Sequence, residues 1–210
     1  MVTWDRTPLR KPSHVSYTNV GGNFNFMKRL VIILVLSLVI MTSKSQDSKF
    51  PSGLIYGQLA AYQISAVDDW VLDNKAGLGA GLHCVLYLKN STWEQSSVIM
   101  YGKIASTNFK TVKEFTDFAY TEFKKEDSNF KRERLADVKI DEAYKAIIYK
   151  YVGGPYNSYE GAAYVQVDNA VCYVVFSARN ENDYNKYAES LIRIIKTFKY
   201  RRDFIGHKEN

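Results

Sequence analysis

The sequence has few of the residues from which metal and hydrolytic sites are built. Its 210 residues include two cysteines and three histidines. The motifs His-Glu-x-x-His, Cys-x-x-Cys and Gly-x-Ser-x-Gly are missing, as is the acid-rich loop of EF-hands. We therefore expect no metal ion and no cofactor. A Ser-His-Asp arrangement would depend on His83, because His207 lies three residues from the end.

Excess positive charge is also scarce outside the first 45 residues. The whole chain carries 28 Lys and Arg against 22 Asp and Glu. Residues 1–45 hold six of these bases and one of these acids. The other 165 residues therefore carry 22 bases and 21 acids, a net charge of +1. Such a balance provides no basic surface for nucleic acid, so we expect no nucleic-acid partner.

Long hydrophobic runs are absent apart from one short stretch, Leu30 to Met41, in which eleven of twelve residues are apolar. The basic pair Lys28 and Arg29 precedes it, and the small residues Ser43 and Ser45 follow it. This order is typical of a secretory signal peptide. No cysteine stands near the end of the run, which excludes the lipid anchor of bacterial lipoproteins.

The length of this run favours cleavage over anchoring. A helix of twelve residues spans about 18 Å, well short of a hydrocarbon core of roughly 30 Å. We therefore predict a signal peptide over residues 27–45, cleavage before Gln46, and a periplasmic or extracellular location in a bacterium. The alternative is an uncleaved anchor formed by residues 30–43, and only then do we expect association with a membrane.

The remainder of the chain divides around this leader. Residues 1–26 are polar, with two prolines and two glycines, which predicts a disordered upstream extension. Met27 stands where a signal peptide would begin, so we expect the true start there. Beyond the leader we expect a flexible N-terminus over residues 46–57, a single domain over 58–200 and a tail over 201–210.

Two segments have the pattern of capped helices. Thr111 and Glu114 form a capping box ahead of apolar residues at helical spacing, which predicts a helix over about residues 112–125. Asn180 is a suitable cap for a second helix over about residues 181–198, with acids in its first turn and lysines in its last.

Apolar runs rich in β-branched and aromatic residues predict strands over residues 59–65, 70–72, 82–88, 98–104, 143–152, 159–167 and 170–177. We expect the first two to pair with each other. We expect the last three to form a meander, with Asp168 and Asn169 as a two-residue hairpin turn. The order of strands, helix, strands, helix predicts an α+β fold, a mainly antiparallel sheet flanked by two helices.

Four short stretches carry a resemblance to a known group of proteins. They are Asp69–Asn74, Gly77–His83, Ser91–Trp93 and Val98–Tyr101. They resemble a group of small secreted bacterial proteins of unknown function, and the element order resembles the PsbP and Mog1 type of α/β/α sandwich. The resemblance implies this sandwich over about residues 58–200. PsbP-like proteins help photosystem II retain its ions and Mog1-like proteins bind a small GTPase, but neither role carries over by matching residues.

Other chemical motifs have simpler explanations. The alternating glycines at positions 77, 79 and 81 lead into a predicted strand instead of a helix, which favours a tight loop over a phosphate cradle. Cys84 and Cys172 lie in apolar strand runs, which favours buried thiols, with a disulfide as the alternative. The basic residues around position 130 are interspersed with acids, which indicates a solvated surface.

One segment, residues 70–93, combines residue types that recognise ligands. We predict that a functional site lies here, with candidate ligand-binding residues Trp70, Asp73, Asn74, Gly79, Gly81, His83 and Trp93. The alternative is that both tryptophans belong to the core and that His83 is only hydrogen-bonded beneath the loop.

The sequence thus favours an exported, non-catalytic binding or accessory domain for an unknown small molecule or protein. The alternative is an enzyme, hydrolase-like, with an unrecognised site around His83.

Overall fold

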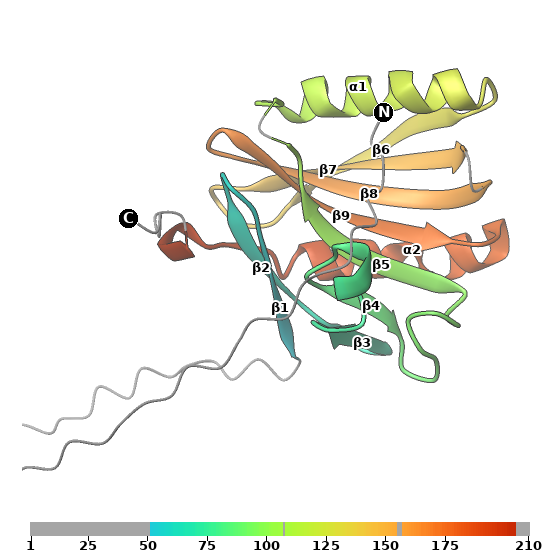
Figure 1. Ribbon diagram of the computed structural model, residues 1–210, viewed down its shortest axis with the longest axis horizontal. Coiled ribbons are helices and arrows are strands. Elements are labelled where there is room, and N and C mark those ends of the chain that lie inside the picture. The colour runs from blue at the N-terminus through green and yellow to red at the C-terminus, as the bar shows by residue number, and fades with distance from the viewer. Residues whose placement is uncertain (1–50, 107, 155–156, 205–210) are drawn as a thin grey trace, which may run out of the picture. The chain divides into compact units, whose positions relative to one another are not determined.

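The computed structural model describes residues 51–106, 108–154 and 157–204. The predicted extension, signal peptide and cleavage point lie outside the described residues. A seven-stranded sheet crosses the described part of the chain (Figure 1). Its strands are β3 (Trp70–Asp73), β4 (Val85–Leu88), β5 (Val98–Ile104), β6 (Lys131–Lys139), β7 (Lys145–Gly153), β8 (Ser158–Val167) and β9 (Ala170–Ala178). Their order is β3-β4-β5-β9-β8-β7-β6, and every neighbouring pair is antiparallel.

A second, smaller sheet packs against the first. It contains β1 (Ser52–Tyr56), β2 (Ala61–Ser65) and β10 (Lys199–Tyr200), in the order β1-β2-β10. The Tyr62 hydroxyl donates to the main-chain oxygen of Tyr173 at 2.6 Å, which connects the centres of the two sheets.

The small sheet corrects three expectations. Residues 52–56 are not flexible, because β1 pairs with β2 from Ser52↔Ser65 to Tyr56↔Ala61. The domain therefore begins before residue 58. The predicted strands 59–65 and 70–72 do not pair, because β2 and β3 belong to different sheets. The predicted tail also begins with a 3₁₀ turn, η2 (Arg202–Phe204).

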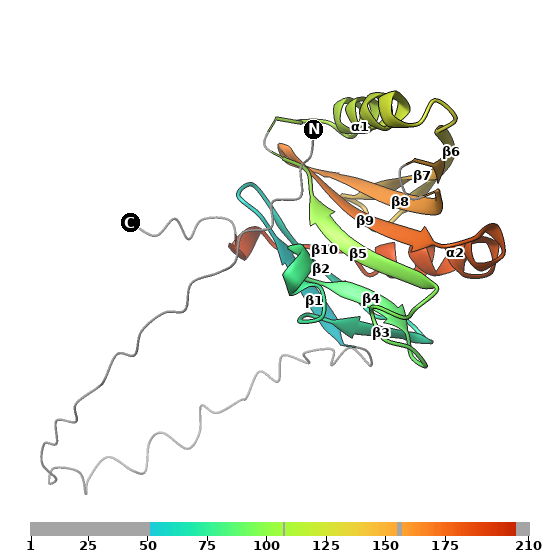
Figure 2. The ribbon, with the colours of Figure 1, turned by 45° about the vertical axis from the view of Figure 1, so that its right-hand side comes forward.

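Two helices lie on opposite faces of the large sheet: α1 (Val112–Glu126) and α2 (Glu181–Ile195) (Figure 2). On β9, Tyr173 contacts Phe115 of α1, whereas Phe176 contacts Tyr184 of α2. Residues 173 and 176 differ by an odd number, so their side chains point to opposite faces of the strand. The α+β architecture, with a mainly antiparallel sheet flanked by two helices, is confirmed.

Both predicted helix caps are confirmed. The Thr111 hydroxyl accepts from the Glu114 amide at 3.1 Å, and the Asn180 side chain accepts from the Asp183 amide at 2.9 Å. The Glu114 carboxylate reaches back one residue further than a capping box requires and accepts from the Lys110 amide at 3.1 Å.

The second helix ends three residues earlier than predicted. The Thr197 hydroxyl donates to the Ile194 carbonyl at 2.7 Å, close to the end of α2. The chain then turns, so that Phe198 enters the core and β10 can pair with β2.

The predicted meander is confirmed as β7, β8 and β9, and Asp168 adopts a φ of 37° in the turn between β8 and β9. The strand β6 was not predicted, because most of its side chains are exposed and its residues show no apolar alternation. The predicted strand 82–88 begins only at Val85, so His83 and Cys84 precede it.

Candidate functional site

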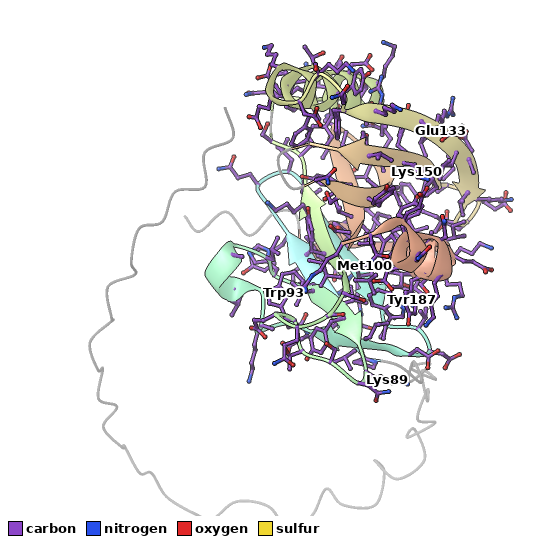
Figure 3. The ribbon with its side chains drawn as sticks, turned by 90° about the vertical axis from the view of Figure 1, so that its right-hand side faces the viewer. Lys89, Trp93, Met100, Glu133, Lys150 and Tyr187 are labelled. Atoms are coloured by element: carbon purple, nitrogen blue, oxygen red, sulfur yellow. The ribbon has the colours of Figure 1, made fainter. Side chains whose placement is uncertain are left out.

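The structure distributes the predicted site residues among different environments. Trp70 is a core residue with 2% of its surface exposed. Its ring meets Phe176 and Tyr187 edge-on, with centroids 6.3 and 6.4 Å away. Trp93 lies in the loop between β4 and β5 and is half-buried. Figure 3 shows Trp93 and Tyr187 on opposite sides of the large sheet.

Asp73 shapes the turn that follows β3. Its Oδ1 accepts from the amides of Lys75 and Ala76 at 2.7 and 3.0 Å, and its Oδ2 accepts from the Tyr87 hydroxyl at 3.3 Å. The amide hydrogen bonds hold the pKa of Asp73 below its usual value. Asp73 therefore has a structural role in its own loop.

His83 stacks on Tyr56 of β1, with the ring centroids 4.0 Å apart. Within the described part of the chain, no hydrogen bond or ion pair joins His83 to Asp73. The structure therefore does not bring the two predicted titrating residues together as a pair.

The remaining candidates lie in an exposed turn. Asn74, Gly79 and Gly81 are exposed, and residues 78–80 form a single 3₁₀ turn, η1 (Leu78–Ala80). Gly81 ends this turn with a φ of 68°, a left-handed conformation that favours glycine. The tight-loop interpretation of these glycines is confirmed.

Trp93 borders a cavity with a volume of about 390 Å³. We call it the Trp93 pocket. It is lined by Trp93, Glu94, Ser96, Ser97, Ile99, Ser158, Ser177, Ala178 and Arg179.

The sheet register assembles the floor of the Trp93 pocket. Ile99 of β5 lies opposite Ser177 of β9, and Ser177 lies opposite Glu160 of β8. The three side chains share the face on which α1 lies, because Ser177 is four residues from Tyr173. At about 3.3 Å per residue, four residues separate this row from Tyr173 by roughly 13 Å. The helix packs Phe115 on Tyr173, at the far end of β9 from the pocket.

Arg179 fixes the loop that carries Trp93. Its Nη2 donates to the Glu94 carbonyl at 3.2 Å, and its amide donates to the Ser97 carbonyl at 3.2 Å. The buried Ser96 hydroxyl donates to the Val98 carbonyl at 2.5 Å. These bonds make the rim of the pocket a defined structure.

Beside Ser177 in this row lies Glu160, which sequence reasoning missed. The Ser158 hydroxyl donates to Glu160 Oε1 at 3.3 Å. Burial raises the pKa of Glu160, and the neighbouring Ser177 and Ser158 hydroxyls offset part of that effect. The sequence did contain a signal, because strand alternation places Glu160 on the same face as the buried Ala162 and Tyr164.

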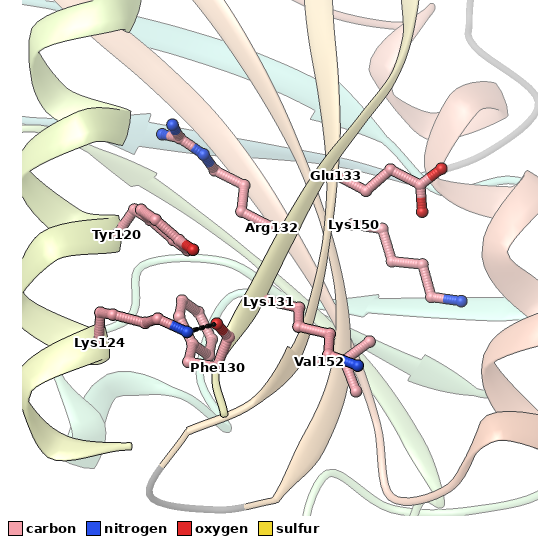
Figure 4. Close-up of a pocket in the computed structure, with 8 residues that line it drawn as sticks. All are labelled: Tyr120, Lys124, Phe130, Lys131, Arg132, Glu133, Lys150 and Val152. Carbon is pink, nitrogen blue, oxygen red and sulfur yellow. Dashed lines mark hydrogen bonds between the residues drawn. The ribbon is translucent and has the colours of Figure 1, made fainter. Parts of the chain in front are cut away.

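A second cavity, of about 360 Å³, lies beside the edge strand β6. Figure 4 shows Arg132 and Tyr120 on one side of this strand and Lys150 on the other. Arg132 pairs with Asp117 at 2.9 Å and lies over the Tyr120 ring at 4.7 Å. Lys150 lies 4.0 Å from Glu181. The side chains of Arg132 and Lys150 thus already interact with other parts of the domain.

The described residues contain no group of three or more His, Cys, Asp or Glu side chains that could hold a metal ion. Cys84 and Cys172 are buried, free thiols, as predicted. No helix in the described ranges is long and apolar enough to cross a membrane.

The fold and the pocket together define an α+β domain with one side of its sheet open beside Trp93. No protein-family model and no curated protein matches the sequence. The structure is similar to the solution structure of cyanobacterial PsbP (CyanoP) from Synechocystis sp. PCC 6803, with 14% identity, coverage of 67% of this chain and 86% of that chain, and a TM-score of 0.42. It is also similar to a point mutant of the protein Mog1, with 8% identity, coverage of 66% and 89%, and a TM-score of 0.39. These are the two types that the element order resembles.

Proposed function

We propose that the chain is an exported, non-catalytic binding domain of a bacterium and that the Trp93 pocket holds its ligand. The observation that supports this most is the composition of the pocket. Trp93 and Ile99, both half-buried, supply apolar surface, while Arg179, Glu94 and four serines supply polar groups at the same cavity. Binding sites typically combine an apolar lining with a few placed polar groups, and the volume is within their usual range.

The position of the pocket also supports a binding role. It lies at the end of β5 and β9 away from Phe115 of α1, on a rigid sheet, with Trp93 in a loop held by Arg179. Binding residues are frequently found on loops that a rigid scaffold positions.

The contacts of His83 and Asp73 weigh against the hydrolase alternative. A general base needs a partner that orients it and a nucleophile within hydrogen-bond reach. The His83 ring packs on Tyr56, and the Asp73 carboxylate is bound to amides and to Tyr87.

The proposed export of the chain rests on the leader sequence alone.

Indole N–H signals in NMR spectra test the proposal. The chain has three tryptophans, at positions 4, 70 and 93. We would titrate the full chain with methyl glucoside, adenosine, glutamate and a tripeptide, and assign the signals with single Trp→Phe variants. At least one probe should shift the Trp93 signal and leave the buried Trp70 signal in place. The proposal fails if no probe shifts the Trp93 signal.

A further inference from the structure

We infer that the ligand of the Trp93 pocket is a neutral, hydroxyl-rich sugar ring; this inference rests on the proposed function. Hydrogen bonds that Ser158 and Arg179 already make decide which groups these two side chains can offer a ligand.

The Ser158 hydroxyl faces the cavity as an acceptor. A serine hydroxyl has one hydrogen to donate and two lone pairs. Ser158 donates to the Glu160 carboxylate at 3.3 Å, so it has only its oxygen lone pairs to offer a ligand, and Ser177 lies opposite Glu160 in the same row. A ligand at this floor must therefore bring its own O–H or N–H donors.

At the rim, Arg179 offers a ligand hydrogen-bond donors instead of acceptors. A guanidinium group has five N–H donors and no acceptor. The side chain of Arg179 uses one of its nitrogens on the Glu94 carbonyl and is otherwise exposed at the rim. The same ligand must therefore accept hydrogen bonds at the rim and donate them at the floor. A hydroxyl group does both, and a ring that carries several hydroxyls meets both demands at once.

The apolar lining sets the shape of the ligand. The Trp93 indole is a flat apolar surface, and Ile99 lies at the floor below the loop. A sugar ring has C–H groups on its faces and hydroxyls around its edge, which suits one flat aromatic wall with polar groups around it.

The charges near the pocket disfavour an anionic ligand. Glu94 lines the pocket and the Glu160 carboxyl lies next to Ser158 and Ser177 of its floor, whereas Arg179 is the single cation among the lining residues. A phosphate or carboxylate ligand would have to approach two acidic groups. A neutral ligand avoids this repulsion.

Titration of the full chain with sugars and with matched probes of other classes tests the inference. Methyl glucoside, methyl galactoside and N-acetylglucosamine represent single rings, and a tetramer of each sugar represents a ring within a polymer. At least one of them should shift the Trp93 indole signal. Trp93→Ala should weaken that binding by about tenfold or more, because truncating an aromatic anchor removes much of the contact energy. Isothermal titration calorimetry measures it, since this variant has no Trp93 indole signal. Trp93→Phe should retain part of the binding.

Two further variants and one control test how the polar groups of the pocket contribute to sugar binding. Arg179→Gln should weaken sugar binding several-fold, while Arg134→Gln, a change at an exposed arginine of β6, should leave it unchanged. Ser177→Ala should also weaken it, since a floor acceptor is lost. Unchanged indole signals of Trp70 would show that each variant remains folded.

The outcomes distinguish the two proposals. Binding of tetramers but not of single rings would support the inference and identify a polymer as the source. If adenosine, glutamate or the tripeptide shifts the Trp93 signal while every sugar fails, the sugar class is wrong and the binding pocket stands. If no probe moves that signal, both proposals fall.

Discussion

The His83 ring lies flat against the Tyr56 ring, with centroids 4.0 Å apart and planes inclined by 5°. Tyr56 ends β1 of the small sheet, and His83 precedes β4 of the large sheet. The stack therefore joins β1, an edge strand of the small sheet, to the segment that leads into β4, an inner strand of the large sheet. We propose that this contact contributes to stability.

The first prediction concerns this stack. His83→Ala and Tyr56→Ala should each lower the free energy of unfolding, and a double-mutant cycle should give a coupling of about 0.5–1.5 kcal/mol. Urea unfolding of the four proteins measures it. Additive effects would show that the rings do not interact in solution. Loss of ligand binding in His83→Ala without loss of stability would revive the enzyme alternative.

The parts of the fold that could be predicted depend on local chemistry. Thr111 and Asn180 are caps whose hydrogen bonds lie within three residues, so both helices were found. β6 could not be found in this way. It is an edge strand with charged, exposed side chains, and only its pairing with β7 makes it a strand.

For the site, composition located Trp93 but did not separate it from Trp70. Both tryptophans lie in the same polar segment, and only the tertiary structure shows that one faces α2 while the other borders a pocket. The sequence could also have predicted that Ser177 lies opposite Glu160. A two-residue turn at Asp168 and Asn169 fixes the register of its hairpin, which places Glu160 opposite Ser177.

The second prediction concerns the close approach of β1 to the loop before β4. A Cβ on Gly53 would lie 2.3 Å from the Cys84 sulfur and 2.9 Å from Asn74 Oδ1. Gly53→Ala should therefore destabilise the protein by about 1–3 kcal/mol through overpacking. Cys84→Ala in the same chain removes the sulfur and should recover part of this loss.

The matched control for Gly53 is Gly79→Ala. A Cβ at Gly79 meets no atom within 4 Å, so the free energy of unfolding should change by less than about 0.5 kcal/mol. Thermal or urea unfolding of all the variants makes the comparison. Equal effects at the two glycines would contradict the packing of β1 against Cys84.

The third prediction concerns the two thiols. Burial raises the pKa of Cys84 to about 12 and raises the pKa of Cys172 as well, so neither forms a thiolate near neutral pH. Iodoacetamide should modify neither cysteine in the native protein and both in the denatured protein, as counted by mass spectrometry. Rapid native labelling, or a disulfide in the purified protein, would contradict this prediction.

The fourth prediction concerns Trp70. Its indole N–H is buried and has no hydrogen-bond partner among the described residues. Trp70→Ala should cost about 3–5 kcal/mol, because it leaves a large cavity between Phe176 and Tyr187. Trp70→Phe should cost less than half of that, since it retains a ring and removes the unpaired donor. Equal losses in the two variants would indicate that the N–H is paired in solution.

The last prediction concerns the pH dependence that Glu160 gives to stability. Burial raises its pKa in the folded state above the ordinary value of 4.5, so the folded state retains this proton to higher pH than the unfolded state. The resulting stabilisation is fully present below 4.5 and is lost as pH rises through the folded pKa. Tyr151 and Tyr164, whose charges would couple to Glu160, have raised pKa values and remain neutral in this range.

Glu160→Gln removes this titration, so its free energy of unfolding relative to the wild type should increase as pH rises above 4.5 and become constant once the pH exceeds the folded pKa. Asp127→Asn is a control of opposite sign, because the amides of Gly154 and Asn129 lower the pKa of Asp127. Relative to the wild type, that variant should lose stability as pH rises towards the ordinary value of 3.8, and the difference should be constant at higher pH. Urea unfolding from about pH 2 to 8 measures both differences. A flat difference for Glu160→Gln would contradict this prediction, because it would mean that folding does not shift the pKa of Glu160.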